Sequence, residues 1–213
     1  MDEAAARRWL MDELDVSSET FERLDSFVAF LRDENERQNL VSRGTLDSIW
    51  TRHILDSAQL IRFAPDAATW LDLGTGAGFP GLVVAALHPA RVTMVEERRM
   101  RVDFLHRASE LLGIEGKSEV IPSKVERFEA RPFDAISARA FAPLAKLLDL
   151  GAPFATPGTR WVLPKGRNAK SELEAVESSW QGVFQLEPSL TDTDAQIIVA
   201  EQVRRRGKGT RKP

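Results

Sequence analysis

The chain has 213 residues, no cysteine and a formal net charge of −3, which together exclude disulfides, a thiolate metal site and a cysteine nucleophile. No apolar run approaches the roughly 20 residues that a membrane-spanning helix needs, and the acidic start Met1–Ala4 lacks the basic and apolar regions of a signal peptide. The sequence therefore favours a cytoplasmic protein of one domain with an extension, without a membrane segment or a metal site.

Helical patterns dominate residues 1–62. A first helix is expected over Glu3–Leu14, and Ser17 suits the N-cap of a second. Apolar residues recur at helical spacing in the second helix and indicate a buried stripe, namely Phe21, Leu24, Phe27, Val28 and Leu31. A third helix is expected from about Leu46 to Leu60. These helices predict an N-terminal extension over residues 1–62 that packs on the main domain.

The third predicted helix carries polar residues with two interpretations. Arg52 and Asp56 are four residues apart and can pair on one face of an α-helix. His53, Asp56 and Ser57 also share a face. These side chains form either a polar seam that holds the extension on the main domain, which is the favoured reading, or a rim that faces a substrate. His53 is kept as a candidate substrate-binding residue.

A glycine-rich stretch follows. The apolar run Thr69–Leu73 predicts a buried strand, and after it Gly74, Gly76 and Gly78 alternate with other residues. Pro80 suits the first turn of a helix, since its missing N–H has no partner there. A strand, a glycine turn and a helix start favour a loop against which a small polar ligand can lie.

The acids near this loop narrow the ligand class. Read literally, Gly76-x-Gly78-x-x-Gly81 matches a dinucleotide fingerprint. Asp72, however, lies where a dinucleotide loop brings a pyrophosphate, and its carboxylate better suits a cationic ligand such as S-adenosylmethionine. The alternative for Asp72 is a capping or turn aspartate. Glu96 ends the next strand, 91–95, where an acid can accept hydrogen bonds from both ribose hydroxyls of either cofactor, and Glu97 is interpreted as a surface charge.

The rest of the chain alternates strands and helices. Helices are expected over 98–113, 141–150 and 170–180, and strands over 119–121, 133–137, 158–163, 183–186 and 195–203. The last two strands are joined by a loop too short for a helix and should be antiparallel. Residues 63–203 thus predict an α/β domain with a doubly wound sheet of five parallel strands and a closing antiparallel hairpin.

Residues 204–213 contain six basic residues and no acid. We expect this segment to be a disordered tail, which serves either as a solubilising end or as an arm for RNA phosphates. Arg204, Arg205 and Arg206 are therefore candidate RNA-binding residues.

Polar residues gather just past the predicted strand ends. Asp72, Glu96, Arg139 and Lys165 follow four different strands, and Glu126 lies a few residues past another. Ligands of such sheets bind outside the carboxyl ends of the strands, so these residues outline a pocket above the sheet. For Arg139, the alternative is a structural salt bridge to a carboxylate at the same edge.

Several segments between residues 39 and 166 carry a family resemblance. They are Asn39-Leu40, Arg52-His-Ile-Leu-Asp-Ser57, Asp72-Leu-Gly-Thr-Gly-Ala-Gly-Phe-Pro-Gly81, Arg101-Val-x-Phe-Leu105, Val125-Glu126, Ser137-Ala-Arg-Ala-Phe141 and Lys165-Gly166. With them the chain resembles the RsmG family, also called glucose-inhibited division protein B. Its members have a Rossmann-like class I methyltransferase fold and methylate N7 of one guanine in small-subunit (16S) ribosomal RNA.

The resemblance implies roles for individual residues. Gly74 and Phe79 are expected along the cofactor S-adenosylmethionine, Glu96 at its ribose, and Val125 and Glu126 at its adenine. Arg139 is expected to reach both cofactor and substrate and is the candidate catalytic residue, with Lys165 a candidate substrate contact. Many relatives have aspartate at Glu96 and arginine at Lys124, so Lys124 receives no role.

The residue inventory fits this chemistry. Guanine N7 has a free lone pair and can attack a sulfonium methyl without a general base, so catalysis rests on positioning and electrostatics. C5 methylation of a pyrimidine normally needs a cysteine, and methylation of an exocyclic amine usually shows an Asn/Asp-Pro-Pro-aromatic loop where this chain has Ser137-Ala-Arg-Ala-Phe141.

Two other function classes stay open. One is a dinucleotide-dependent oxidoreductase, and the other is a non-catalytic RNA-binding or ribosome-assembly protein with the same fold. The expected partner is small-subunit ribosomal RNA or an assembling subunit, and a monomer is favoured.

Overall fold

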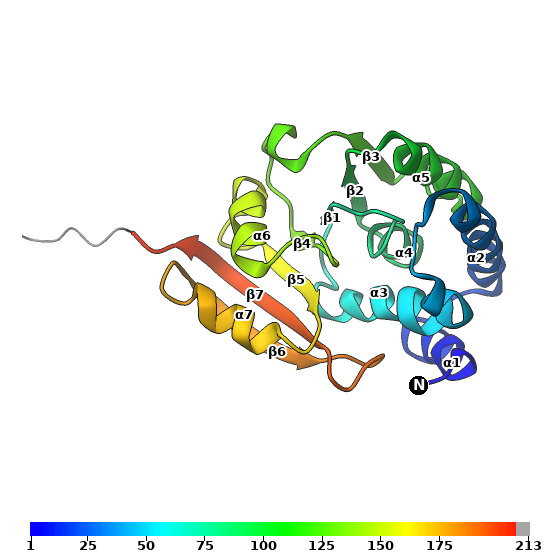
Figure 1. Ribbon diagram of the computed structural model, residues 1–213, viewed down its shortest axis with the longest axis horizontal. Helices are drawn as coiled ribbons and strands as arrows, with labels where there is room; N and C mark the ends of the chain where they lie inside the picture. Colours follow the sequence, from blue (N-terminus) through cyan, green and yellow to red (C-terminus); the bar gives the residue numbers. More distant parts are fainter. Residues whose placement is uncertain (208–213) are drawn as a thin grey trace, which may run out of the picture.

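A seven-stranded sheet organises residues 1–207, the part of the chain that the computed structural model describes (Figure 1). The strands are β1 (Thr69–Leu73), β2 (Arg91–Glu96), β3 (Ser118–Pro122), β4 (Ala135–Ser137), β5 (Arg160–Lys165), β6 (Trp180–Pro188) and β7 (Gln196–Arg205). Their order is β3-β2-β1-β4-β5-β7-β6. The first five are parallel, whereas β7 is antiparallel to β5 and to β6. The predicted doubly wound sheet with a closing hairpin is confirmed.

Four helices connect or flank these strands. They are α4 (Gly81–Leu87), α5 (Arg99–Leu112), α6 (Leu144–Gly151) and α7 (Ala169–Val176). α5 ends at Gly113, which has a left-handed φ of 65° and donates its N–H to two carbonyls of the last turn. The predicted helix over 170–180 is too long, because Trp180 opens β6 instead. The Trp180 ring is 3% exposed and packs in the core beneath the hairpin, so packing overrides its helical context.

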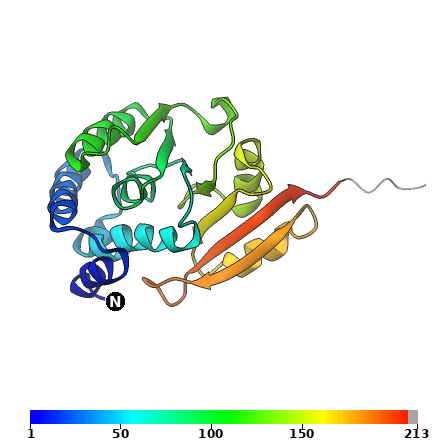
Figure 2. The same ribbon diagram turned by 180° about the vertical axis from the view of Figure 1, so that it is seen from behind.

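The N-terminal helices are α1 (Glu3–Leu14) and α2 (Ser18–Gln38). Each begins at a side-chain cap, since Asp2 accepts from the N–H of Ala5 at 2.7 Å and Ser17 accepts from that of Thr20 at 3.2 Å. The predicted apolar stripe of α2 is buried with residues of α4 and α5 in one core. Figures 1 and 2 show α1 and α2 at one end of the molecule and the β6–β7 hairpin at the other.

The helix expected from about Leu46 to Leu60 is present, but it is not a regular α-helix. Residues 43–63 form an irregular helical run, with a 3₁₀ segment (Arg43–Ser48), a π-helical turn (Trp50–Leu55), a short α-helix, α3 (Asp56–Ala58), and a second 3₁₀ segment (Gln59–Phe63). The carboxylate of Glu3 accepts from the N–H groups of Trp50 at 3.1 Å and Thr51 at 2.8 Å, where the π turn begins. A π turn closes hydrogen bonds from residue i to residue i+5 and is therefore wider than an α turn.

The C-terminal prediction also needs correction. Arg204 and Arg205 are the last residues of β7, and Arg205 lies opposite Trp180 in the hairpin. Arg206 donates its Nε to the backbone oxygens of Glu177 at 2.7 Å and of Trp180 at 3.0 Å. The predicted disordered tail therefore cannot begin at residue 204, because strand pairing and these bonds fix 204–206. The rest of that prediction falls on 208–213, outside the described residues. None of the helices within 1–207 combines the length and apolar character of a membrane span.

Candidate functional site

The site lies at the carboxyl edge of the parallel strands, where β1 and β4 separate the two halves of the sheet. Asp72 of β1 is the register partner of Ser137 of β4. Ser137 Oγ donates to Asp72 Oδ1 at 2.9 Å and accepts from Trp70 Nε1 at 2.9 Å. This switch point is where open α/β sheets place their ligands.

Asp72 is fully buried at this point. Its Oδ2 accepts from the backbone N–H of Gly81, the first residue of α4, at 3.0 Å. Burial raises the pKa of Asp72 to about 6, against the opposing effect of its hydrogen bonds from Ser137 and Gly81. The geometry is that of the capping aspartate, one of the two sequence interpretations. The N-terminus of α4 thus already holds a carboxylate where a dinucleotide loop holds a pyrophosphate.

The glycine loop is held from the β2 side by Glu96. Gly74, Gly76 and Gly78 have φ values of 64°, 60° and 86°, a region that side chains with a Cβ rarely adopt. Glu96 Oε2 accepts from the N–H of Gly76 at 3.1 Å, and Oε1 accepts from that of Arg98 at 2.9 Å. Each carboxylate oxygen can accept a second hydrogen bond, so Glu96 has acceptor capacity left for a ligand.

A cavity of about 420 Å³ opens beside this loop, and we call it the glycine-loop cleft. It is lined by Gly74, Val95–Arg98, Arg101, Ser123–Glu126, Ala140–Ala142, Lys146 and Leu150. Of the predicted cofactor-binding residues, Gly74, Glu96, Val125 and Glu126 line it. Asp72, Gly76, Gly78, Phe79 and Arg139 are not among its lining residues. Lys124, which received no role, is a wall residue and lies 3.8 Å from Glu97.

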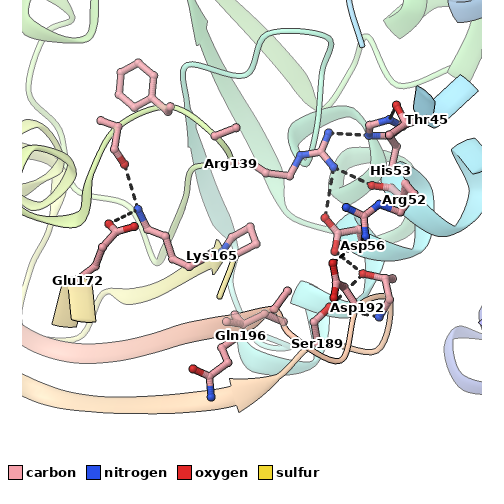
Figure 3. A pocket seen from close by; sticks show the side chains of 18 of the residues that line it. Thr45, Arg52, His53, Asp56, Arg139, Lys165, Glu172, Ser189, Asp192 and Gln196 are labelled. Atoms are coloured by element: carbon pink, nitrogen blue, oxygen red, sulfur yellow. Dashed lines mark hydrogen bonds and ion pairs between the residues drawn. The ribbon is translucent and has the colours of Figure 1, made fainter. Parts of the chain in front are cut away.

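A second cavity of about 680 Å³ shares the lining residues Ala140–Ala142 with the glycine-loop cleft, and we call it the Arg139 pocket (Figure 3). It is lined by Thr45, Arg52, His53, Asp56, Arg139–Pro143, Pro164–Gly166, Glu172, Ser189, Thr191, Asp192 and Ala195–Ile197. Both cavities have volumes typical of ligand sites. The sequence analysis named Arg139, His53 and Lys165 as candidate site residues, and all three line this pocket.

Arg139 is held from three directions. Its Nη1 donates to the carbonyl of Arg52 at 3.1 Å and to Asp56 Oδ2 at 3.3 Å. Its Nη2 lies 3.0 Å from His53 Nδ1, and its guanidinium lies 5.0 Å from the centre of the Phe79 ring. Burial lowers the pKa of Arg139, and Asp56 opposes that effect. Arg139 does form a salt bridge, the alternative considered for it, but the carboxylate is that of Asp56 in α3 and not one at a strand end.

These contacts define the protonation state of His53. A guanidinium only donates, so Nδ1 of His53 accepts and its proton lies on Nε2, 2.9 Å from Thr45 Oγ1. Burial, with the positive charges of Arg139 and Arg52, lowers the pKa of His53 to about 3. The ring also stacks on Phe79, with centroids 5.0 Å apart. His53 is thus a neutral support for Arg139 near neutral pH.

Lys165 lies on the opposite side of the pocket (Figure 3). Its Nζ donates to Ala142 O and to Glu172 Oε2, both at 3.0 Å. Glu172 Oε2 also accepts from the N–H of Leu144, the first residue of α6, at 2.6 Å. Glu172 escaped the sequence analysis because it lies within an ordinary charged helix, α7.

The loop between β6 and β7 closes the pocket over the irregular helical run. Arg52 Nη1 lies 3.1 Å from Asp192 Oδ2, and Thr191 Oγ1 donates to Asp56 Oδ1 at 2.7 Å. The expected Arg52–Asp56 pair is wrong, because Arg52 binds Asp192 and Asp56 binds Arg139 and Thr191. The two interpretations of these polar residues, a seam between the extension and the main domain and a rim that faces a substrate, therefore describe the same side chains. Arg52, His53 and Asp56 hold the extension in place and also line the pocket.

Arg204, Arg205 and Arg206 are not among the lining residues of either cavity. Gln196 pairs with Lys165 at the pocket end of β5, and Arg205 is nine residues farther along β7. At strand spacing this separates Arg205 from the pocket edge by about 30 Å. Arg205 instead pairs with Asp149 and lies over the Trp180 ring.

Residues Ala140–Ala142 are the wall that the two cavities share. Ala140 has a left-handed φ of 51°, which is uncommon for a residue with a Cβ. The Phe141 ring packs directly on Gly74, so that a Cβ at position 74 would overlap it. Lys165 anchors the far end of the wall through Ala142 O.

Comparisons with known proteins show which family this chain is similar to. The model of the family described as "rRNA small subunit methyltransferase G" matches residues 20–195. A protein named ribosomal RNA small subunit methyltransferase G from Rhizorhabdus wittichii is 52% identical over 212 residues, which are 98% of this chain and 97% of that one. The protein of the same name from Novosphingobium aromaticivorans is 51% identical over 92% of this chain and 87% of its own.

Solved structures share the fold at low identity. An O-methyltransferase from Bacillus cereus, in complex with SAH, has a TM-score of 0.60 at 17% identity and covers 92% of this chain and 97% of its own. A cofactor-bound protein from MTB has a TM-score of 0.66 at 13% identity and covers 95% of this chain and 98% of its own. These structures match along nearly the whole chain.

Proposed function

Because the chain belongs to the rRNA small subunit methyltransferase G family, we propose that it transfers a methyl group from S-adenosylmethionine to N7 of a guanine in 16S ribosomal RNA. The observation that carries the proposal is the segment Ala140–Ala142, which lines both a cofactor-sized cleft and a larger pocket with cationic side chains, so that the two cavities adjoin. A methyl group must pass between two ligands held edge to edge, and this arrangement provides for it.

The glycine-loop cleft fits S-adenosylmethionine. Glu96 has acceptor capacity for the ribose hydroxyls, and Val125 offers an apolar contact for the adenine beside Glu126. Gly74 brings backbone to the cleft wall without a Cβ. Asp72 supports the loop from below by fixing the start of α4 and does not line the cleft.

The same contacts argue against a dinucleotide. The N–H of Gly81 at the start of α4 donates to the buried Asp72 carboxylate, so it is not free for a pyrophosphate. A dinucleotide would bring further negative charge close to Asp72. This observation favours S-adenosylmethionine over NAD(H), and it disfavours the oxidoreductase class.

The mechanism needs positioning more than proton transfer. The cofactor supplies an electrophilic methyl group on a sulfonium sulfur. Guanine N7 carries a lone pair and no proton, so the pocket needs no general base, and the neutral, engaged His53 is not one. Arg139 uses three of its five N–H groups on Arg52, Asp56 and His53, which leaves two to orient the base or its phosphate.

The pocket also has groups for the charge of the product. Methylation at N7 leaves the guanine positively charged. Asp56 and Glu172 place carboxylates in the pocket lining, on the sides of Arg139 and Lys165 respectively. Lys165 is a candidate contact for a base oxygen or a phosphate. We further propose a cytoplasmic, monomeric enzyme whose residues 1–62 complete the substrate pocket of the methyltransferase domain.

The test is methyl transfer to 16S RNA and small subunits from cells that lack the enzyme. Isotope-labelled S-adenosylmethionine and nucleoside analysis should yield 7-methylguanosine. A methylated pyrimidine carbon or adenine amine would contradict the N7 assignment. No transfer, with RNA binding retained, would favour the non-catalytic assembly role. Calorimetry with S-adenosylmethionine and with NAD(H) separates the two cofactor classes.

A further inference from the structure

Phe141 is a partly exposed aromatic residue at the functional site. It is 37% exposed, whereas Phe79, which stacks on His53 in the same site, is 2% exposed. It lines both the glycine-loop cleft and the Arg139 pocket. A ligand that covers this ring would remove apolar surface from water, which is favourable. The ring therefore lies where the two proposed ligands must meet.

The backbone around Phe141 is fixed rather than loose. Ala140 takes the left-handed region, which is unfavourable for a residue with a Cβ and is kept at sites where the surroundings enforce it. After Phe141, the carbonyl of Ala142 accepts from Lys165 at 3.0 Å, and the N–H of Leu144 donates to Glu172 at 2.6 Å. The ring itself rests on Gly74. These contacts make Phe141 a preorganised surface.

We propose that Phe141 is the stacking platform for the target base. The base lies in the Arg139 pocket with one π-face on the Phe141 ring and its N7 edge toward the glycine-loop cleft. Arg139, two residues earlier on the same segment, then reaches the polar edge of that base. This inference rests on the proposed function, since it names the residue that holds the base in place for the transfer.

If Phe141 served only to cover Gly74, its side chain would not have to be aromatic. To cover Gly74, any apolar side chain of similar length suffices, and leucine would serve. Stacking on a purine needs a flat π-face, which tyrosine keeps and leucine lacks. Replacing the residue by leucine and by tyrosine therefore separates the two roles.

The experiment compares Phe141→Leu, Phe141→Tyr and the wild-type protein. Phe141→Leu should lower kcat/KM for the RNA substrate by about 5- to 150-fold, the range for loss of one base–aromatic stack. It should also weaken RNA binding to the SAH-bound protein. Phe141→Tyr should stay within about twofold of wild type on both counts, because its ring offers the same face. Because Phe141 also lines the glycine-loop cleft, affinity for S-adenosylmethionine is measured separately and should fall by less than kcat/KM for RNA does. The melting temperature should be unchanged in both variants.

Phe63→Leu is the matched control, since Phe63 is outside both cavity linings and the chemical change is the same. It should behave as wild type. The inference is overturned if Phe141→Leu retains full kcat/KM, if Phe141→Tyr loses as much as Phe141→Leu, or if the loss follows a loss of cofactor affinity. Should the leucine variant fail to fold, Phe141→Met against Phe141→Tyr decides the same question. Nucleoside analysis of the wild-type product tests the proposed function separately, because the leucine–tyrosine comparison holds for whichever base is methylated.

Discussion

Arg139 donates a hydrogen bond from Nη2 to Nδ1 of His53 over 3.0 Å, so the ring nitrogen that faces the guanidinium carries no proton. Nε2 of His53 then donates to Thr45, whose hydroxyl donates to Ser42 O at 2.8 Å. Because the guanidinium can only donate, the donor and acceptor of each following hydrogen bond in this series are determined. Arg139 is thus oriented by a residue of the π turn and not only by its own strand.

The first prediction concerns His53 as a positioning residue. His53→Ala should lower the maximal rate of methyl transfer by about tenfold, as expected for loss of one hydrogen bond to a charged group. Cofactor affinity should not change, because His53 is not a lining residue of the glycine-loop cleft. Steady-state kinetics at saturating RNA measures the effect. His106→Ala, an exposed residue on α5, is the control, and equal rates in the two variants would remove His53 from the mechanism.

The second prediction concerns Asp72 and pH. The pKa of Asp72 is raised from 3.8 to about 6 on folding. The stability that this shift contributes is fully present below pH 3.8 and is lost as the pH rises through about 6. Asp72→Asn removes the titration, so the melting temperature of the variant minus that of wild type should rise between pH 4.5 and about pH 7.5. Parallel melting curves across that range would contradict the buried, titrating carboxylate.

The third prediction compares two glycines with the same backbone. Gly74 and Gly76 have φ values of 64° and 60°, so Ala at either position meets similar backbone strain, on the order of 1 kcal/mol. Only at Gly74 does the added Cβ overlap the Phe141 ring, whereas at Gly76 its nearest neighbour is an Arg101 nitrogen at 3.5 Å. Gly74→Ala should therefore cost more stability than Gly76→Ala. In a Phe141→Ala background the two costs should converge, and a persistent difference would refute the overlap.

The fourth prediction concerns Asp192 at the pocket mouth. Its carboxylate pairs with Arg52, a side chain that is 43% exposed and can reach a phosphate instead. Asp192→Asn should raise RNA affinity by about two- to fivefold, the scale of a surface ion pair, and steepen its salt dependence. Asp194→Asn removes the same charge from the same loop without touching Arg52 and serves as the control. Equal changes in both variants would mean that only net charge matters.

The fifth prediction concerns the basic C-terminal residues 204–213, which the sequence analysis treated as a single tail. Deleting 204–213 removes the end of β7 and the two Arg206 hydrogen bonds, whereas deleting 208–213 leaves them. The longer deletion should cost about 1–2 kcal/mol and lower the melting temperature by about 2–8 °C. The shorter one should leave the melting temperature unchanged. Calorimetric melting of both proteins is the test, and equal loss would point to residues 208–213 instead.

The sheet, the glycine loop and the polar residues at the cavity edge could be predicted from the sequence, because each depends on a pattern of neighbouring residues. A buried strand, alternating glycines and polar residues after strand ends are visible in short windows. The π turn was missed, because six residues of helical pattern do not distinguish a wider turn from a regular one. The carboxylate that accepts hydrogen bonds at the start of this turn belongs to Glu3, which lies 47 residues from Trp50 in the chain.

Long-range pairing explains the other gaps. The choice of Asp192 over Asp56 as partner of Arg52 is made 140 residues away and depends on how the closing hairpin folds back. Both readings of Asp72, as a ligand contact and as a cap, stayed open because the sequence does not reveal that the N–H of Gly81 donates to it. The exposure of Phe141 is equally invisible in a sequence that contains 11 phenylalanines.

The residues that line the two cavities have a consequence for the order in which the protein is made. The glycine-loop cleft draws its lining from positions 74 to 150, whereas the Arg139 pocket needs residues from 45 to 197. Every lining residue of the glycine-loop cleft is therefore translated before β5, whereas the Arg139 pocket takes its last lining residues from the closing hairpin.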